Sequence, residues 1–368
     1  MRTPFEHGEF LGLKRFPALD GLRAVAALMV VLFHSQGPDW LQGWLGVQVF
    51  FVLSGFLITT LLLREESRKG RINLREFYRR RAFRILPVYF LVLVLTAAGL
   101  LVAGEFLRDP LGHDFPLYLV FFNEFGHGGP YGQSWSLGIE QKFYLLWPLL
   151  AFVLCSPSLG RSRRLGVTLV LMAVALAAAP FTVSADPRGW PVHYFSVLVG
   201  CLLAITMHSP RGYRLIRPLT RPWVTVVAAV LFVGAHLSVT AVSNALDKSW
   251  LLPTIPGFVS VVPLYAVAVA LMLPALLAPG PPQWLLSRRP MVFLGERSYS
   301  IYLWQSIAQG VVIAILPASA GVGRWLPTAI VAVVLADLCY RWLERPMIRL
   351  GRTIGQRRQM ALDAAGGH

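Results

Sequence analysis

Charged residues are scarce in this sequence, and acidic ones are the scarcest. Only 14% of the 368 residues are charged, with 18 Asp and Glu against 34 Lys and Arg. Hydrophobic residues make up 55% of the chain, and the mean hydropathy is +0.58. These values exclude a soluble domain and are typical of a polytopic α-helical membrane protein.

Cysteine is also rare, and several motifs with a known chemistry are missing. Cys155, Cys201 and Cys339 lie in apolar segments, where a thiol behaves as a small hydrophobic group. The cysteines and the eight histidines show no CxxC, HxxxH or HExxH spacing, so no metal site is predicted. No GKS or GxGxxG loop indicates an NTPase or a Rossmann site. The first apolar run is long and holds charges, so we expect no cleavable signal peptide.

The formal net charge of +16 would suit a nucleic-acid partner, but its distribution indicates a membrane protein instead. The arginines gather in short loops between apolar runs, which is the positive-inside pattern. We therefore expect no nucleic-acid partner. The apolar runs of spanning length are 17–35, 45–63, 85–104, 135–155, 165–185, 191–208, 222–242, 254–278, 293–317 and 325–343.

An eleventh run, Phe115–Phe125, is too short to span, and the charge pattern supports that reading. If it does not cross, the basic loops lie on the side of both termini, and the opposite side keeps only Arg108, Arg188, Lys248 and Arg324. If it crosses, most of this asymmetry is lost. The sequence thus predicts an all-α polytopic membrane protein, a bundle of about ten transmembrane helices with an internal cavity. It also predicts a multi-pass protein of the cell membrane with both termini cytoplasmic.

We expect no second globular domain. Residues 1–16 form a cytoplasmic lead-in, 17–346 the transmembrane domain, and 347–368 a basic cytoplasmic tail. The tail is expected to lie on an anionic leaflet or to be disordered.

The first apolar segment carries Asp20, Arg23 and His34. Ionisable groups at membrane depth are costly and usually face a protein interior or a watery cavity. Arg23 and His34 are close to three turns apart, which places them on one helix face, roughly 16 Å apart along the axis. Asp20 and Arg23 form either an ion pair that holds helices together or part of the chemistry. Because a histidine side chain can change its charge near neutral pH, His34 is the first candidate for a catalytic base, although a lone histidine is often only a hydrogen-bonded core residue.

The densest positive charge runs from Arg64 to Arg84. The usual excess of Lys and Arg in cytoplasmic loops explains much of this positive charge. It explains Arg80, Arg81 and Arg84 less well. These three stand at a helix start and are flanked by aromatic residues. Guanidinium groups match phosphate oxygens, and aromatic rings can stack on a purine. A nucleotide or coenzyme A is therefore a candidate ligand.

Polar residues also open two later apolar segments. Ser136 and Glu140 are four residues apart, so their side chains share a helix face. Ser136 is alternatively an N-cap, and Arg23 or Lys142 is a candidate partner for Glu140. The stretch 293–305 either lines the same cavity or anchors the membrane interface.

Five motifs in order resemble the membrane-bound acyltransferase-3 family over residues 16–346. They are Leu19-Asp-Gly-Leu-Arg23 with His34, Phe50-Phe-Val-Leu-Ser-Gly-Phe-Leu-Ile58, Arg80-Arg-x-x-Arg84-Ile-Leu-Pro87, Trp135-Ser-Leu-Gly-Ile-Glu140 and Ser298-Tyr-Ser-Ile-Tyr-Leu-Trp304. The resemblance implies transfer of an acyl group, most often acetyl, from acyl-CoA to a hydroxyl of a sugar, polysaccharide or macrolide-type acceptor.

The resemblance also implies roles for single residues. His34 matches the essential first-helix histidine, the three arginines match a motif associated with the CoA donor, and Ser136 and Glu140 match a Ser-x-x-x-Glu motif. We add Asp20 and Arg23 to the catalytic set and assign Ser136, Trp135 and Tyr302 to substrate binding. Two positions depart from the family pattern: Gln141 replaces an acid and Gln305 a histidine. Some members carry a carboxy-terminal hydrolase-like domain, which is not expected here.

The mechanism expected is direct transfer, with His34 as general base on the acceptor hydroxyl and no covalent acyl-enzyme. Acetyl-CoA is the expected donor, and no metal takes part. The alternative is a transporter or flippase for a polar or glycosylated substrate, in which buried charges line a pathway without chemistry.

Overall fold

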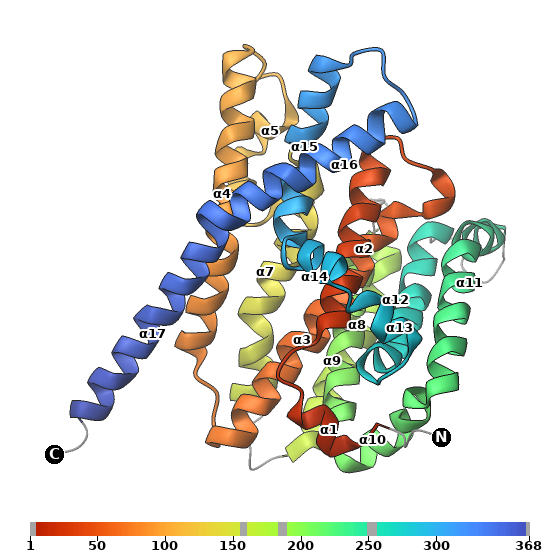
Figure 1. Cartoon of the computed structure of the whole chain (residues 1–368), viewed down its shortest axis with the longest axis vertical. Helices are drawn as coiled ribbons and strands as arrows, with labels where there is room; N and C mark the ends of the chain where they lie inside the picture. The colour runs from red at the N-terminus through yellow and green to blue at the C-terminus, as the bar shows by residue number, and fades with distance from the viewer. Residues whose placement is uncertain (1–4, 155–159, 183–189, 249–255, 366–368) are drawn as a thin grey trace. The chain divides into compact units, whose positions relative to one another are not determined.

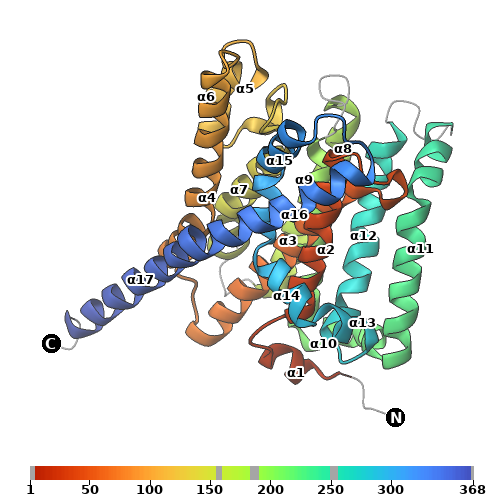
Figure 2. The ribbon, with the colours of Figure 1, turned by 45° about the horizontal axis from the view of Figure 1, so that its top comes forward.

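The computed structural model consists of helices and their connections (Figures 1 and 2). The structure describes residues 5–154, 160–182, 190–248 and 256–365, and no strand occurs among them. Cys155 and Arg188 lie outside these residues. An all-α polytopic fold is thus confirmed.

Eight helical stretches among the described residues are long and apolar enough to cross a membrane. They lie at Pro17–His34, Asp39–Lys69, Leu74–Val102, Ser162–Thr182, Trp190–His208, Pro222–Asp247, Val259–Leu277 and Val322–Gln356. The other two predicted spans also coincide with helix. The run 135–155 forms α7 (Trp135–Pro148) and a π-helical turn (Leu149–Val153), and the run 293–317 contains α15 (Ser298–Ile315). The Phe115–Phe125 run holds only the five-residue α6 (Phe115–Leu119) and a single 3₁₀ turn, too short to span.

Two predicted helix limits near the arginine-rich segment are wrong. The run 45–63 continues as α3 (Gly46–Lys69), and the run 85–104 begins much earlier as α4 (Leu74–Val102). Gly70 ends α3 with φ +70°, a conformation that glycine adopts at little cost. Asn73 then caps α4, its side chain accepting a hydrogen bond from the amide of Glu76. The predicted loop 64–84 is therefore mostly helix, and its arginines lie on helical turns.

The predicted span at 293–317 is also interrupted. Helix α14 (Arg289–Glu296) ends one residue before α15 begins. The guanidinium of Arg297 donates to the carbonyl of Phe293 at 2.9 Å and lies over its ring, so this side chain satisfies an end of α14.

The chain divides into two compact units. Unit 1 is Met1–Ile72 with Ile139–Ser298, and unit 2 is Asn73–Gly138 with Tyr299–His368. Unit 1 holds α3, α14, most of α7 and these helices: α1 (His7–Gly12), α2 (Pro17–His34), α8 (Gly160–Thr182), α9 (Trp190–His208), α10 (Pro210–Ile216), α11 (Pro222–Asp247), α12 (Gly257–Leu277) and α13 (Pro281–Leu286). Unit 2 holds α4, α5 (Pro110–His113), α6, nearly all of α15, α16 (Val322–Cys339) and α17 (Arg345–Ala365).

Glycines set the closest helix contacts in unit 1. A Cβ at Gly55 on α3 would overlap the carbonyl of Val197 on α9, and a Cβ at Gly200 on α9 would overlap the carbonyl of Val52 on α3. The absence of both side chains lets the two backbones touch, as small residues do between membrane helices. This contact fixes the part of α3 that carries Ser54.

Unit 1 also contains a pocket of about 260 Å³. It is lined by apolar and aromatic side chains of α7, α8 and α9, among them Phe143, Trp147 and Leu198. None of the candidate residues lines it. This cavity is therefore not the polar one that the sequence predicts around the candidate residues.

Candidate active site

Helix α2 carries Asp20, Arg23 and His34, as the sequence predicts. It begins at Pro17, which suits a first helical position because proline has no amide hydrogen to leave unsatisfied. Gly295 of α14 lies against the carbonyl of Asp20, where any Cβ would overlap it. The start of α2 is therefore packed tightly against α14.

Asp20 and Arg23 form a local ion pair. Their side chains approach to 3.3 Å across one turn, and both are partly exposed, at 31% for Asp20 and 19% for Arg23. Such a pair neutralises two charges that would each be costly in an apolar environment. The geometry agrees with the structural role considered for these two residues.

His34 is the last residue of α2, and its side chain is exposed. Its Nδ1 lies 2.9 Å from the carbonyl oxygen of Val30. Because a carbonyl only accepts, this contact places the ring proton on Nδ1 and leaves Nε2 as the basic nitrogen. That is the tautomer a general base requires, but a hydrogen-bonded helix end would show the same contact.

Glu140 is held by hydroxyl groups from two helices. Ser54 of α3 donates to its Oε1 at 2.6 Å, and Tyr144, one turn along α7, donates to its Oε2 at 3.3 Å. The two hydroxyls are themselves 3.1 Å apart, and both residues are 7% exposed. A carboxylate bound by two buried hydroxyls is a fixed negative group, not a mobile surface charge.

Ser54 was not among the residues singled out from the sequence. The sequence offers Arg23 and Lys142 as candidate partners of Glu140, and the structure adds two hydroxyl partners, Ser54 and Tyr144. A serine inside the otherwise apolar run Phe50–Ile58 was the available signal, since a hydroxyl at membrane depth needs a hydrogen-bond partner.

In unit 2, the structure brings Ser136 and Tyr302 together. Their hydroxyl oxygens are 2.7 Å apart, and the Tyr302 hydroxyl also donates to the carbonyl of Gln133. Helix α7 begins at Trp135, so Ser136 lies inside the first turn. The alternative that Ser136 is the N-cap is therefore wrong. Trp135, which directly precedes Ser136 in the chain, is half-buried.

The segment before Ser136 is fixed to α4 by tyrosines. Tyr89 donates to the carbonyl of Tyr118, and Tyr131 donates to the carbonyl of Tyr89, both at 2.9 Å. Burial raises the pKa of Tyr131, which keeps its hydroxyl neutral and able to donate. These bonds give the Ser136 turn a rigid support.

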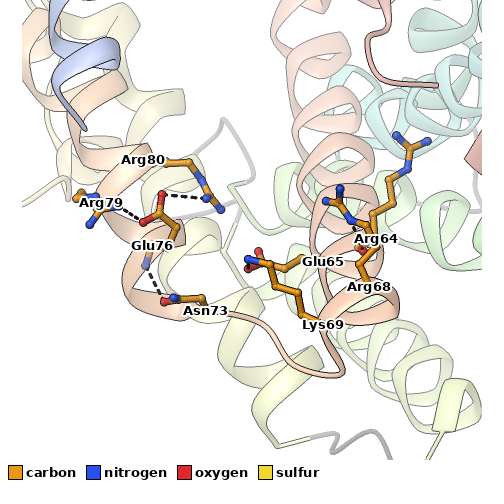
Figure 3. A network of polar contacts seen from close by, with 8 residues as sticks. All are labelled: Arg64, Glu65, Arg68, Lys69, Asn73, Glu76, Arg79 and Arg80. Atoms are coloured by element: carbon orange, nitrogen blue, oxygen red, sulfur yellow. Dashed lines mark hydrogen bonds and ion pairs between the residues drawn. The ribbon is translucent and has the colours of Figure 1, made fainter. Parts of the chain in front are cut away.

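Arg80, Arg81 and Arg84 lie in the first three turns of α4, near a partly neutralised cluster (Figure 3). Glu76 forms ion pairs with both Arg79 and Arg80; its Oε1 lies 3.1 Å from Nη1 of Arg80. Arg81 lies over the ring of Phe77, 5.8 Å from its centre. Arg84 is half-buried. Phe77 is 3% exposed, so its ring packs beneath Arg81 and does not offer a face to a purine. The guanidinium groups are the part of the cluster that suits a phosphate.

Arg64, at the start of the arginine-rich segment, has a different environment from Arg80, Arg81 and Arg84. Its guanidinium donates to the carbonyls of Phe10 and Leu13 at 2.7 and 2.6 Å and lies between two phenylalanine rings. On the same turns of α3, Lys69 pairs with Glu65 at 3.6 Å (Figure 3). Arg64 therefore has a structural task, which is to hold the amino-terminal segment against α3.

Gln305 is 2% exposed, and neither polar atom of its amide finds a hydrogen-bond partner among the described residues. Buried amides are normally satisfied. Gln305 occupies the position at which the family pattern has a histidine, one turn after Tyr302 on α15.

Comparison with known proteins identifies the fold family. The profile of an acyltransferase domain, Acyl_transf_3, matches residues 16–341. The chain belongs to the acyltransferase-3 family. No solved structure matches it.

Relatives of this acyltransferase-3 chain include enzymes of bacterial cell walls. It is 30% identical to YrhL of Bacillus subtilis (strain 168), described as a candidate peptidoglycan O-acetyltransferase, over 90% of this chain and 54% of that protein. It is 29% identical to the O-acetyltransferase OatA of Staphylococcus aureus (strain NCTC 8325 / PS 47), over 91% and 57% of the two chains. It is 26% identical to the peptidoglycan O-acetyltransferase OatA of Listeria monocytogenes, over 92% and 56%. The chain thus spans about half the length of these relatives.

Proposed function

We propose that this acyltransferase-3 chain transfers an acetyl group to a hydroxyl of a cell-envelope glycan, with peptidoglycan as the first acceptor to test. Two of the relatives named above are described as peptidoglycan O-acetyltransferases and the third as an O-acetyltransferase, and the profile match covers nearly the whole chain. A macrolide acceptor has no such support. The transporter alternative is not favoured, because the matched family is one of acyltransferases.

The family match supports the catalytic part, and the contact between His34 Nδ1 and the carbonyl of Val30 is compatible with it. With the proton held on Nδ1, Nε2 accepts the proton of the acceptor hydroxyl. The alkoxide oxygen then attacks the thioester carbonyl, and the carbon–sulfur bond breaks. The proton on Nε2 returns to the departing thiolate, so the balanced products are the ester and the free thiol.

Acyl-CoA is the donor we propose, bound through its phosphates by Arg80, Arg81 and Arg84. Arg80 also pairs with Glu76, which offsets part of its charge. Glu140 and the Ser136–Tyr302 hydroxyl pair remain our proposed orienting and substrate-binding groups. Asp20 and Arg23 act on α2 through their ion pair, which fixes the start of that helix.

The test is thiol release by the purified chain in nanodiscs, with acetyl-CoA as donor and muropeptides or peptidoglycan oligomers as acceptors. We expect free thiol and O-acetylated product in equal amounts, both lost in His34→Ala. Product formed only with an alternative acetyl donor would reject the CoA part and keep the transferase. Neither thiol nor ester with any donor would reject the proposed function.

A further inference from the structure

Helix α17 lies beyond residue 341, where the family match ends. It follows α16 through a π-helical turn (Tyr340–Glu344) and packs on α4 (Figures 1 and 2). Gly351 and Gly355 form the contact surface. A Cβ at Gly351 would come within 2.9 Å of the Phe83 side chain, and Arg79 Nε donates to the carbonyl of Gly351 at 3.0 Å.

The rest of α17 has two different exposed faces. At 100° per residue, Arg345, Arg349 and Arg352 fall within an arc of roughly 60°. All three are exposed. Leu350 and Ile354 are 47% and 41% exposed and lie about 150° from the arginines around the helix. The helix therefore presents a basic face and an apolar face, with its glycine face on α4.

We propose that α17 is an interfacial helix that binds the surface of a bilayer containing anionic phospholipid. Its apolar face would enter the boundary of the hydrocarbon region, and its three arginines would contact lipid phosphates. The first half of α17 follows α16 within a single helical stretch, Val322–Gln356, that is long and apolar enough to span, so α17 lies next to a candidate membrane-spanning segment. A nucleic acid would use the basic face alone and would leave Leu350 and Ile354 exposed to water. Both faces together match a bilayer.

The experiment uses the full chain in nanodiscs of phosphatidylcholine, with and without phosphatidylglycerol. A bimane fluorophore is placed at Thr353→Cys in a background without native cysteines, and nitroxide-labelled lipid quenches it in proportion to contact. Thr353 is exposed and belongs to neither face. We expect phosphatidylglycerol to raise the equilibrium constant for binding of α17 to the bilayer surface on the order of tenfold. Added salt should reduce this increase.

Three sets of variants separate the contributions. The joint change of Arg345, Arg349 and Arg352 to Gln should abolish the phosphatidylglycerol effect, whereas the same three changed to Lys should retain it. Leu350→Asp with Ile354→Asp should lower quenching in both lipids. Size-exclusion profiles and circular dichroism establish that each variant is folded.

Three results would overturn the proposal. The first is equal quenching of the parent with and without phosphatidylglycerol. The second is a phosphatidylglycerol effect that survives the Gln substitutions. The third is quenching that follows the number of chains per disc instead of the lipid, which would assign the two faces to a contact between copies.

Discussion

Ser54 Oγ lies 2.6 Å from Glu140 Oε1, so a serine of α3 holds a carboxylate of α7 that is 86 positions away in the chain. Hydrogen bonds to a charged group contribute more than neutral ones. This bond therefore fixes both the carboxylate and the contact between the two helices.

The first prediction follows from this bond. Ser54→Ala should lower the free energy of unfolding by ~1.5–3 kcal/mol and reduce turnover, because Glu140 loses the hydrogen bond from the Ser54 hydroxyl. Thermal unfolding in detergent and the acetyl-transfer rate measure both effects. Ser238→Ala is the matched control, since Ser238 is exposed and bonds only within its own helix turn. Equal behaviour of the two variants would contradict the importance of the Ser54–Glu140 bond.

The second prediction distinguishes two roles for His34, a general base and a hydrogen-bonded helix end. His34→Gln and His34→Ala should insert normally and lose at least ~10²-fold in turnover, because the general base is gone. In the parent, kcat/KM should fall as pH drops and imidazole becomes protonated. Turnover of His34→Gln within a few fold of the parent would show that His34 only ends a helix.

A second histidine provides the control for this experiment. His236 is bonded to the Tyr265 hydroxyl at 2.9 Å and to the carbonyl of Leu41 at 2.8 Å, a purely structural arrangement. His236→Gln should lower stability while leaving turnover per folded molecule within a few fold.

The third prediction concerns the donor. Arg81→Ala and Arg84→Ala should each raise KM for acetyl-CoA on the order of tenfold, the value of a charge-assisted phosphate contact. Arg80→Ala should have a smaller effect because Glu76 shares its charge. Arg75→Ala, an exposed arginine of the same helix, should leave KM unchanged. If KM for acetyl-CoA is unchanged in all three folded variants, the arginines do not bind the donor and only help to set the orientation of the protein in the membrane.

The fourth prediction is the orientation in the membrane. A cysteine at Leu107, which is 80% exposed, should react with an impermeant reagent in intact cells. A cysteine at Ser162, at the start of α8, should react only after permeabilisation, because the basic loops are expected to be cytoplasmic. Labelling of Ser162→Cys in intact cells would contradict the predicted topology, because the loop before α8 would then face outward.

The fifth prediction compares two buried glutamines. Gln305→Leu should leave the unfolding temperature unchanged or raise it, because the amide it removes is unsatisfied among the described residues. Gln48→Leu should lower it, because Gln48 is 1% exposed and bonds His193 and Ser196 at 2.9 Å each. A fall for Gln305→Leu as large as that for Gln48→Leu would mean that the Gln305 amide is satisfied.

The hydropathy pattern predicts the limits of a span well where apolar residues fill the whole helix length, and it misses helical turns made mostly of charged residues. Helix α2 matches its predicted run to within one residue. Helix α4 begins eleven residues before its predicted run, because hydropathy ignores a charged helical turn capped by Asn73. Asn73 and Gly70 are residues typical of helix starts and ends, but such single-residue signals predict a helix limit less strongly than a long apolar run does.

The candidate residues were predicted better than their partners. The pairing of Asp20 with Arg23 follows from spacing alone, since residues three apart on a helix meet. Glu140 and Ser136 each have a partner from a distant segment, Ser54 and Tyr302 respectively. Which distant hydroxyl meets which helix depends on how helices pack, and periodicity within one segment does not contain that information.

The glycine contact between α3 and α9 has a mechanical consequence. Where backbone meets backbone at Gly55 and Gly200, neither helix can slide past the other without collision. The two helices therefore form a stiff pair, and we expect Ser54 to keep its position along α3 relative to α9. Any relative movement of helices within unit 1 is then expected at helices without such a contact, and α11, most of whose apolar window is exposed, is the first candidate.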